Sequence, residues 1–63
     1  MDLVGIEHEG VERDSPADDA VLFKCQDQKV WLPRSQLKDY DEDHLVIPRW
    51  LADARELEPD WEL

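Results

Sequence analysis

The sequence predicts a small α+β domain in which an antiparallel sheet of three or four strands carries one C-terminal helix. Short apolar runs rich in β-branched residues recur at 20–25, 29–32 and 45–47, and each is too short for an ordinary helix. Only one stretch, beginning at Pro48, has apolar residues at helical spacing. Strands followed by a helix are typical of the α+β class, and 63 residues are enough for a single domain with a thin core.

The N-terminal segment, residues 2–12, is expected to form a strand. Within it Val4, Ile6 and His8 alternate with other residues, so their side chains should share one face of the sheet. The following segment, residues 13–19, contains a proline, a serine and three aspartates. This composition is typical of a loop and predicts an acidic one here.

Residues 20–33 are predicted to form a hairpin. The run 20–25 supplies the first strand and 29–32 the returning one, with a tight connection at 26–28. The connection lacks Asn-Gly or Asp-Gly, which leaves the turn type open. Pro33 has no backbone N–H to donate, so the second strand should end there or lie on a sheet edge.

A further strand at 44–47 is expected to pair with the hairpin, and residues 48–58 are expected to form the helix. Pro48 suits the first helical position, where a missing N–H has no cost. The predicted inward face of the helix comprises Trp50, Leu51, Ala54 and Leu57.

The outer face of this helix is predicted to carry an ion pair between Arg49 and Asp53, which are four residues apart. Pro59 should end the helix. The tail, residues 59–63, is then expected to fold back on the sheet or the helix.

The three tryptophans receive two different predictions. Trp31 and Trp50 are expected to pack in the core, because a chain this short needs large side chains there. Trp61 lies in an acidic tail and is the best candidate for a partly exposed anchor for a partner, since tryptophan is enriched at binding hot spots.

No catalytic or metal-binding motif is apparent. His8, Cys25 and His44 lack zinc-site spacing, so no metal or cofactor is expected. The run Asp39, Asp41, Glu42 and Asp43 lacks the glycine and final glutamate of a calcium loop and is better interpreted as a solvated loop. Cys25 lies in an apolar strand, where a thiol usually behaves as an inert hydrophobe. The sequence therefore predicts a protein that is not an enzyme.

Compartment is inferred from three observations. Cys25 is the only cysteine, so no intramolecular disulfide can form and a reducing environment fits. No secretory signal is visible after Met1, and no apolar stretch could span a bilayer. We expect a cytoplasmic protein without membrane contact.

Charge is the outlying property of the chain. Seventeen acidic residues against seven basic ones give a formal net charge of −10, which repels nucleic acid and attracts basic protein surfaces. The carboxylates expected to contact a partner are Glu7, Glu9, Glu12, Asp14, Asp18 and Asp19 in one group and Asp39, Asp41, Glu42 and Asp43 in a second, with Trp61 as an anchor. A third group is ranked lower as a partner contact, because a frayed tail should fit a partner's groove less well than loops and an edge strand do. It comprises Glu56, Glu58, Asp60 and Glu62.

The spacing within the first group is compatible with DNA mimicry. On one strand, Glu7 and Glu9 would stand about 7 Å apart, which approximates the separation of successive phosphates on a DNA strand. Carboxylates at that spacing could compete with DNA for the same lysines and arginines. The alternative is that the acidic coat serves only solubility.

The sequence W-L-P-R-S-Q-L at 31–37, followed by V-I-P-R-W-L-A at 46–52, resembles a group of small proteins encoded by phages and other bacterial mobile elements. In that group a W-I/L-P-K/R-S strand end precedes an I/V-P-x-W-L/F-A helix start. The match rests on Trp31, Pro33, Ser35, Pro48 and Trp50. The resemblance implies a shared fold and origin and leaves the biochemical activity open.

A small, acidic, non-catalytic, phage-like protein is similar in character to anti-CRISPR proteins, several of which are DNA mimics. This likeness implies an inhibitor that binds a basic DNA-reading subunit of a type I CRISPR effector in the bacterial cytoplasm. We expect a monomer rather than a homodimer. One alternative is an accessory interaction protein of a mobile element. Another is an antitoxin-like protein or an antagonist of histone-like proteins.

Overall fold

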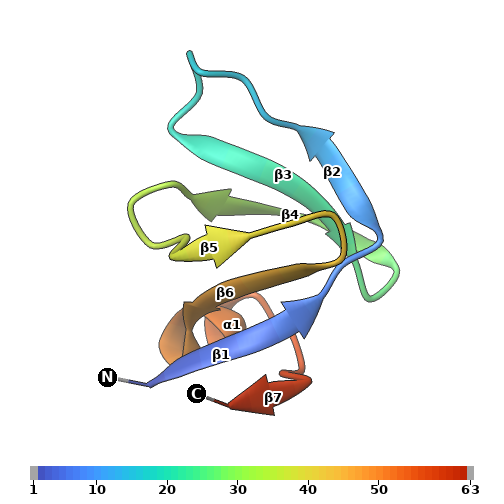
Figure 1. Ribbon diagram of the computed structural model, residues 1–63, viewed down its shortest axis with the longest axis vertical. Helices are drawn as coiled ribbons and strands as arrows, with labels where there is room; N and C mark the ends of the chain where they lie inside the picture. Colours follow the sequence, from blue (N-terminus) through green and yellow to red (C-terminus); the bar gives the residue numbers. More distant parts are fainter. Residues whose placement is uncertain (1, 63) are drawn as a thin grey trace.

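The computed structural model describes residues 2–62, which form two antiparallel sheets and one short helix (Figure 1). The four-stranded sheet, in the order β5-β6-β1-β7, consists of β5 (Asp39–Tyr40), β6 (His44–Pro48), β1 (Leu3–Glu7) and β7 (Trp61–Glu62). The three-stranded sheet, in the order β2-β3-β4, consists of β2 (Gly10–Arg13), β3 (Ala20–Cys25) and β4 (Gln28–Pro33). The helix α1 (Arg49–Ala54) follows β6 directly. Antiparallel strands with one helix in the C-terminal part are confirmed, but the fold is mostly β and has two sheets instead of one.

The two sheets arise because the chain turns a corner between β1 and β2. At this corner the His8 N–H donates to the Asp43 carbonyl at 2.7 Å, beside the four-stranded sheet. The next amide, that of Glu9, donates to the Lys24 carbonyl at 2.7 Å in the three-stranded sheet. One continuous strand over residues 2–12 is therefore wrong, since adjacent amides bond to different sheets. The predicted shared face of Val4, Ile6 and His8 is confirmed, because all three are buried.

Strand β6 pairs with β1 and β5, and the predicted pairing of 44–47 with the hairpin is wrong. In the register of β1 and β6, Val4 lies opposite Ile47 and Ile6 opposite Leu45, so the buried side chains of both strands point to the same side. Matching the buried residues of β6 to those of β1 fixes this register, because a shift of one residue would turn them toward solvent.

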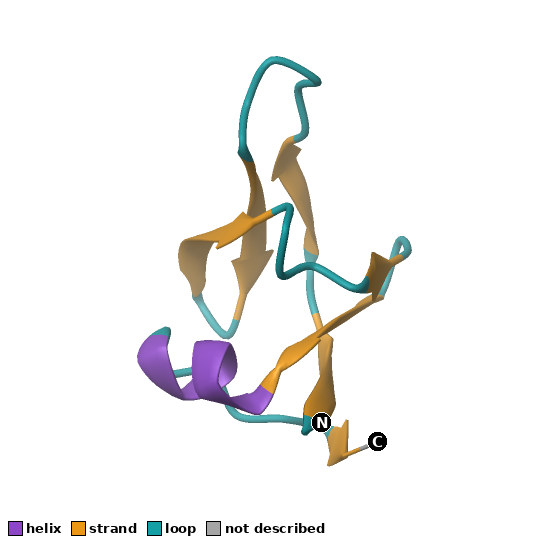
Figure 2. Cartoon of the chain, turned by 90° about the vertical axis from the view of Figure 1, so that its left-hand side faces the viewer, coloured by secondary structure: helices purple, strands orange, loops and turns teal. Residues whose placement is uncertain are grey.

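The predicted hairpin is confirmed as β3 and β4. Cys25 pairs with Gln28, which leaves Gln26 and Asp27 as a two-residue turn with φ of 52° and 61°. Positive φ at both positions defines a type I′ turn, whose twist matches that of the flanking strands. The predicted acidic loop is also present, and residues 14–19 project at the end of the molecule opposite both termini (Figure 2).

The helix is shorter than the predicted span of 48–58. Pro48 precedes the helix as its N-cap, and Glu56, with φ of 58°, stops the chain from continuing as a helix. Leu51 and Ala52 are its buried residues, while Leu57 is buried beyond its end. The predicted inward face is thus confirmed at Leu51, and at Leu57 as a buried residue outside the helix. It is wrong at Trp50 and Ala54, which are exposed.

Neither Trp31 nor Trp50 lies in the core. Trp31 is 45% exposed because it alternates with the buried Val30 and Leu32 and therefore faces outward from β4. Trp50 is 58% exposed because α1 turns its Leu51 and Ala52 side inward. The core is instead built from smaller apolar residues of both sheets, the helix and the segment after it, together with the single phenylalanine, namely Val4, Ile6, Val21, Phe23, Cys25, Val30, Leu32, Leu45, Ile47, Leu51, Ala52 and Leu57.

The tail folds back as a strand. Trp61 lies opposite Gly5 and Glu62 opposite Val4, which adds β7 to the four-stranded sheet. Leu63 lies outside the described residues. Arg49 forms its ion pair with Glu62, so the predicted pair of Arg49 with Asp53 is wrong. The ion pair therefore links the start of the helix to the last strand.

Within residues 2–62, the one helix has six residues and is too short and too polar to cross a bilayer.

Cys25 is fully buried, as predicted for an apolar strand. Burial, with a further contribution from the negative charge of Glu9, raises the pKa of the Cys25 thiol. A higher pKa leaves less of the reactive thiolate at neutral pH. We expect iodoacetamide to modify Cys25 much more slowly in the folded protein than in urea. Equal rates, measured by mass spectrometry, would show that the strand opens or that the thiol is activated.

Candidate functional site

Acidic side chains from three separate parts of the chain gather at one end of the four-stranded sheet. The Glu7 N–H donates to Oδ2 of Asp60, and the neighbouring His8 N–H donates to the Asp43 carbonyl. Figure 1 shows the end of β1, the β5–β6 turn and the start of β7 along the same side of the molecule. We term this surface the acidic rim, and it comprises Glu7, Glu9, Asp41, Glu42, Asp43 and Asp60, all of which are exposed.

The β5–β6 turn of the rim is held in place by Asp41. One oxygen of its carboxylate accepts the N–H groups of Asp43 and His44 at 2.9 and 2.7 Å. These two hydrogen bonds, with smaller contributions from the charges of His44 and His8, hold the pKa of Asp41 below its usual value. The turn therefore presents Glu42 and Asp43 in a fixed conformation.

His8 fixes the same turn from beneath. Its Nε2 lies 2.7 Å from the Asp41 carbonyl, and a carbonyl only accepts, so Nε2 carries the proton. The His8 ring is buried and packs edge-on against Phe23, with its centroid 4.9 Å away. Its Nδ1 has no hydrogen-bond partner among the described residues. The rim is thereby coupled to the core through one histidine.

The predicted acidic loop binds an arginine of its own chain. Arg34 pairs with the Asp14 carboxylate and donates to the carbonyls of Ser15 and Asp18, at 2.7 and 2.8 Å. The Tyr40 hydroxyl also donates to Asp14. Both contacts, with that of Tyr40 the larger, lower the pKa of Asp14. The carboxylate of Asp14 is thus engaged by contacts within its own chain, although the residue is exposed.

Low pH should weaken these internal contacts. Asp14 and Asp41 have folded-state pKa values below the ordinary 3.8, so the stability that they contribute is complete above pH 3.8 and is lost as pH falls through the folded values. We expect the difference in urea midpoint between wild type and Asp14→Asn to shrink from pH 5 to pH 2.5. A constant difference would mean that the charge of Asp14 does not contribute.

Most carboxylates have no ion-pair partner within the part of the chain that the structure describes. Within residues 2–62, four ion pairs join basic residues to carboxylates, so thirteen of the seventeen carboxylates remain unpaired. The four paired carboxylates are Glu12, Asp14, Asp18 and Glu62. All members of the acidic rim belong to the unpaired set.

The structure divides the predicted partner-binding residues into two regions. One region comprises Glu7, Glu9, Asp41, Glu42 and Asp43 in the rim, with Asp39 and Trp61 on the adjoining outer face of the sheet. The other comprises Glu12, Asp14, Asp18 and Asp19, in β2 and the acidic loop. Glu9 lies beyond the end of β1, so the predicted spacing of Glu7 and Glu9 along one strand is wrong.

Sequence reasoning missed Asp60. It ranked the C-terminal carboxylates last, whereas pairing of β7 with β1 brings Asp60 to the rim, and the Asp60 N–H donates to the Gly5 carbonyl at 2.9 Å. The alternation of Trp61 with acidic neighbours in the tail was the available signal for a short strand.

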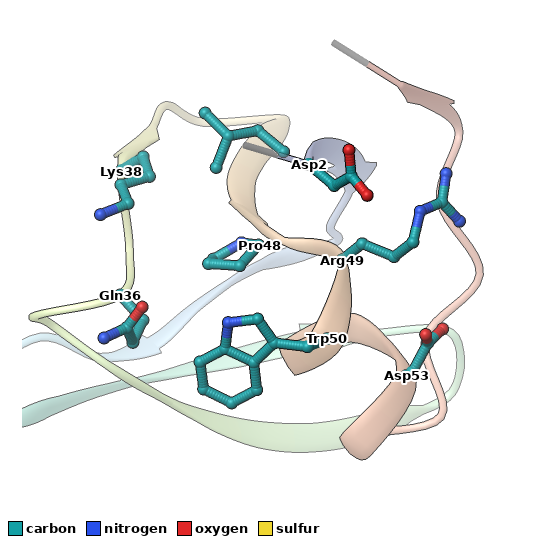
Figure 3. Close-up of a pocket in the computed structure, with 8 residues that line it drawn as sticks. Asp2, Gln36, Lys38, Pro48, Arg49, Trp50 and Asp53 are labelled. Carbon is teal, nitrogen blue, oxygen red and sulfur yellow. The ribbon is translucent and has the colours of Figure 1, made fainter.

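A second surface feature lies beside the helix (Figure 3). This groove has a volume of about 390 Å³, and the indole of Trp50 flanks it. Its lining residues are Asp2, Leu3, Gln36, Lys38, Pro48, Arg49, Trp50 and Asp53. Its lining contains two basic and two acidic side chains, whereas the acidic rim contains only acidic ones.

No group of three or more His, Cys, Asp or Glu side chains within residues 2–62 is arranged to hold a metal ion. No protein-family model, curated protein or solved structure matches the chain.

Proposed function

We propose that this protein is a non-enzymatic inhibitor whose acidic rim occupies a basic surface with which another protein binds DNA. The observation that carries the proposal is the convergence of six exposed carboxylates from three chain segments on one end of a sheet. A concentration of one sign of charge attracts the opposite sign and accelerates association. Arginines and lysines that bind phosphates would meet carboxylates here instead.

Rigidity of the rim supports the same function. Asp41 and His8 fix the β5–β6 turn, and the hydrogen bond from the Glu7 amide to Asp60 fixes the last strand against the first. Preorganised charges lose less entropy on binding than flexible ones. A rim held in this way is better suited to a partner groove than a disordered acidic tail.

The specific form of the proposal is an anti-CRISPR protein directed at the DNA-reading subunit of a type I effector, as the likeness in character to anti-CRISPR proteins suggests. The test is a DNA-binding assay of a purified type I effector with this protein added. We expect DNA binding to fall as the protein saturates the effector, and the inhibition to weaken with salt, because exposed charges are screened over about 8–10 Å at physiological ionic strength. Full DNA binding with this protein visibly bound would contradict DNA mimicry.

A second candidate function is an accessory interaction protein of a mobile element whose acidic coat serves solubility. The groove beside Trp50 favours this candidate, because a Trp that is 58% exposed at the wall of a cavity is a potential anchor for a partner. Trp50→Ala separates the candidates. Loss of partner capture in this variant, with the acidic rim intact, would favour the groove.

A further inference from the structure

A hollow lies on the outer face of the four-stranded sheet, next to the acidic rim. Gly5 lies opposite both Val46 and Trp61, so these residues share the face that points away from the core. The hollow has a volume of about 200 Å³. Its lining residues are Asp39, Tyr40, Asp41, His44, Val46 and Trp61.

The indole of Trp61 forms one wall of this hollow. Gly5 makes this position possible, because a Cβ there would overlap the indole ring. The His44 ring meets the indole edge to face, with centroids 4.9 Å apart and an interplanar angle of 69°. Trp61 remains 37% exposed, so the ring that packs on the glycine backbone also presents aromatic surface to solvent.

The formal charges among the described residues that line the hollow are all negative. Asp39 and Asp41 line the hollow, and none of the lining residues within 2–62 is a lysine or arginine. Glu7 lies opposite His44, and Asp60 immediately precedes Trp61. An exposed indole face ringed by carboxylates attracts a cation both through the ring quadrupole and through direct ion pairing.

We propose that this hollow binds the guanidinium group of an arginine from a basic protein partner, with the group stacked on the indole of Trp61 and hydrogen-bonded to the Asp39 carboxylate. Guanidinium is favoured over ammonium because it is planar, less strongly hydrated and able to stack and donate hydrogen bonds at once. This inference rests on the proposed function and deepens it, since it places one arginine of the basic partner at a defined point beside the rim.

The test uses a protein in which Trp61 is the only tryptophan. Trp31 and Trp50 are both exposed, so Trp31→Phe with Trp50→Phe should leave the fold intact. This protein is titrated with the peptide acetyl-(Arg-Gly)4-amide and with its lysine counterpart, while fluorescence and calorimetry are recorded. We expect a saturable change in Trp61 emission and a Kd about two- to fivefold lower for the arginine peptide, on the scale of an exposed cation–π contact.

Two variants examine the hollow itself. Gly5→Ala should displace the indole, and Asp39→Asn should remove the charge of that side chain while keeping its shape. Each variant should therefore bind the arginine peptide more weakly and discriminate less between the arginine and lysine peptides. Gly10→Ala is the matched control, because a Cβ at Gly10 meets nothing within 4 Å. Circular dichroism and thermal melting verify that each variant is folded.

The outcomes separate this inference from the proposed function. Calorimetry could detect peptide binding while Trp61 emission stays unchanged, or while Gly5→Ala binds with wild-type affinity. Either result would overturn the proposal that the hollow binds arginine and would leave the acidic rim as the binding surface. Equal affinity for arginine and lysine would overturn selection of guanidinium. Absence of binding to either peptide at low salt would count against both the hollow and the proposed function.

Discussion

Replacing Glu7, Glu42 and Asp43 together with lysine is expected to abolish binding to a basic partner. These three side chains are exposed, and their own carboxylates accept none of the hydrogen bonds that hold the rim together, so the fold should survive. Three attractive contacts become repulsive, and like charges across an interface cost several kcal/mol. The affinity should therefore fall by at least about 100-fold. It is measured by calorimetry with the purified effector.

The matched control reverses Asp19, Glu56 and Glu58, which are exposed, form no ion pair among residues 2–62 and are not members of the rim. This control changes the net charge by the same amount, so it isolates position from total charge. We expect affinity within a few fold of wild type and a small decrease in association rate. Equal loss in the two triple variants would mean that diffuse charge, and not the rim, attracts the partner.

Some charged residues near the rim and the acidic loop are unsuitable for such a test because their side chains hold the fold together. Reversing Asp41 along with its neighbours would remove the acceptor for two backbone amides, so a loss of binding could reflect an unfolded turn. Reversing Arg34 would release the acidic loop that it binds. A charge pattern in the sequence does not distinguish carboxylates that face a partner from carboxylates that hold the protein together.

Local patterns predicted the strands well and their assembly poorly. Alternation at Val4, Ile6 and His8 correctly gave the buried face of the first strand, because side-chain direction is a property of the strand alone. The corner after His8 and the addition of β7 depend on contacts with distant residues such as Lys24 and Gly5. For this reason the abundance of carboxylates was evident from the sequence, but their meeting at one rim was not.

The tryptophans were mispredicted for a related reason. Trp31 lies between Val30 and Leu32, so alternation already pointed it outward, and the general preference of large aromatic residues for cores was given too much weight. The predicted helical face at Trp50 assumed a helix that continued through Leu57. Because α1 ends at Ala54, Leu57, the last member of that pattern, is not on the helix at all.

Phe23→Ala should unfold much of the protein population. Phe23 is fully buried, and its ring makes edge-to-face contacts with His8 and Tyr40, with centroids 4.9 and 5.4 Å away. It therefore joins the three-stranded sheet to the corner and to the four-stranded sheet. Such a truncation costs about 3–5 kcal/mol, against a total of about 3–9 kcal/mol for a domain of this size.

The control for Phe23→Ala is Trp50→Ala, which removes a larger side chain from a site that is 58% exposed. This change should cost less than about 1 kcal/mol, as is usual for surface positions. Both variants are compared with wild type by urea titration followed by circular dichroism. A urea midpoint for Trp50→Ala as low as that for Phe23→Ala would show that Trp50 stabilises the protein as a core residue does. A wild-type midpoint for Phe23→Ala would mean that the two sheets are joined without it.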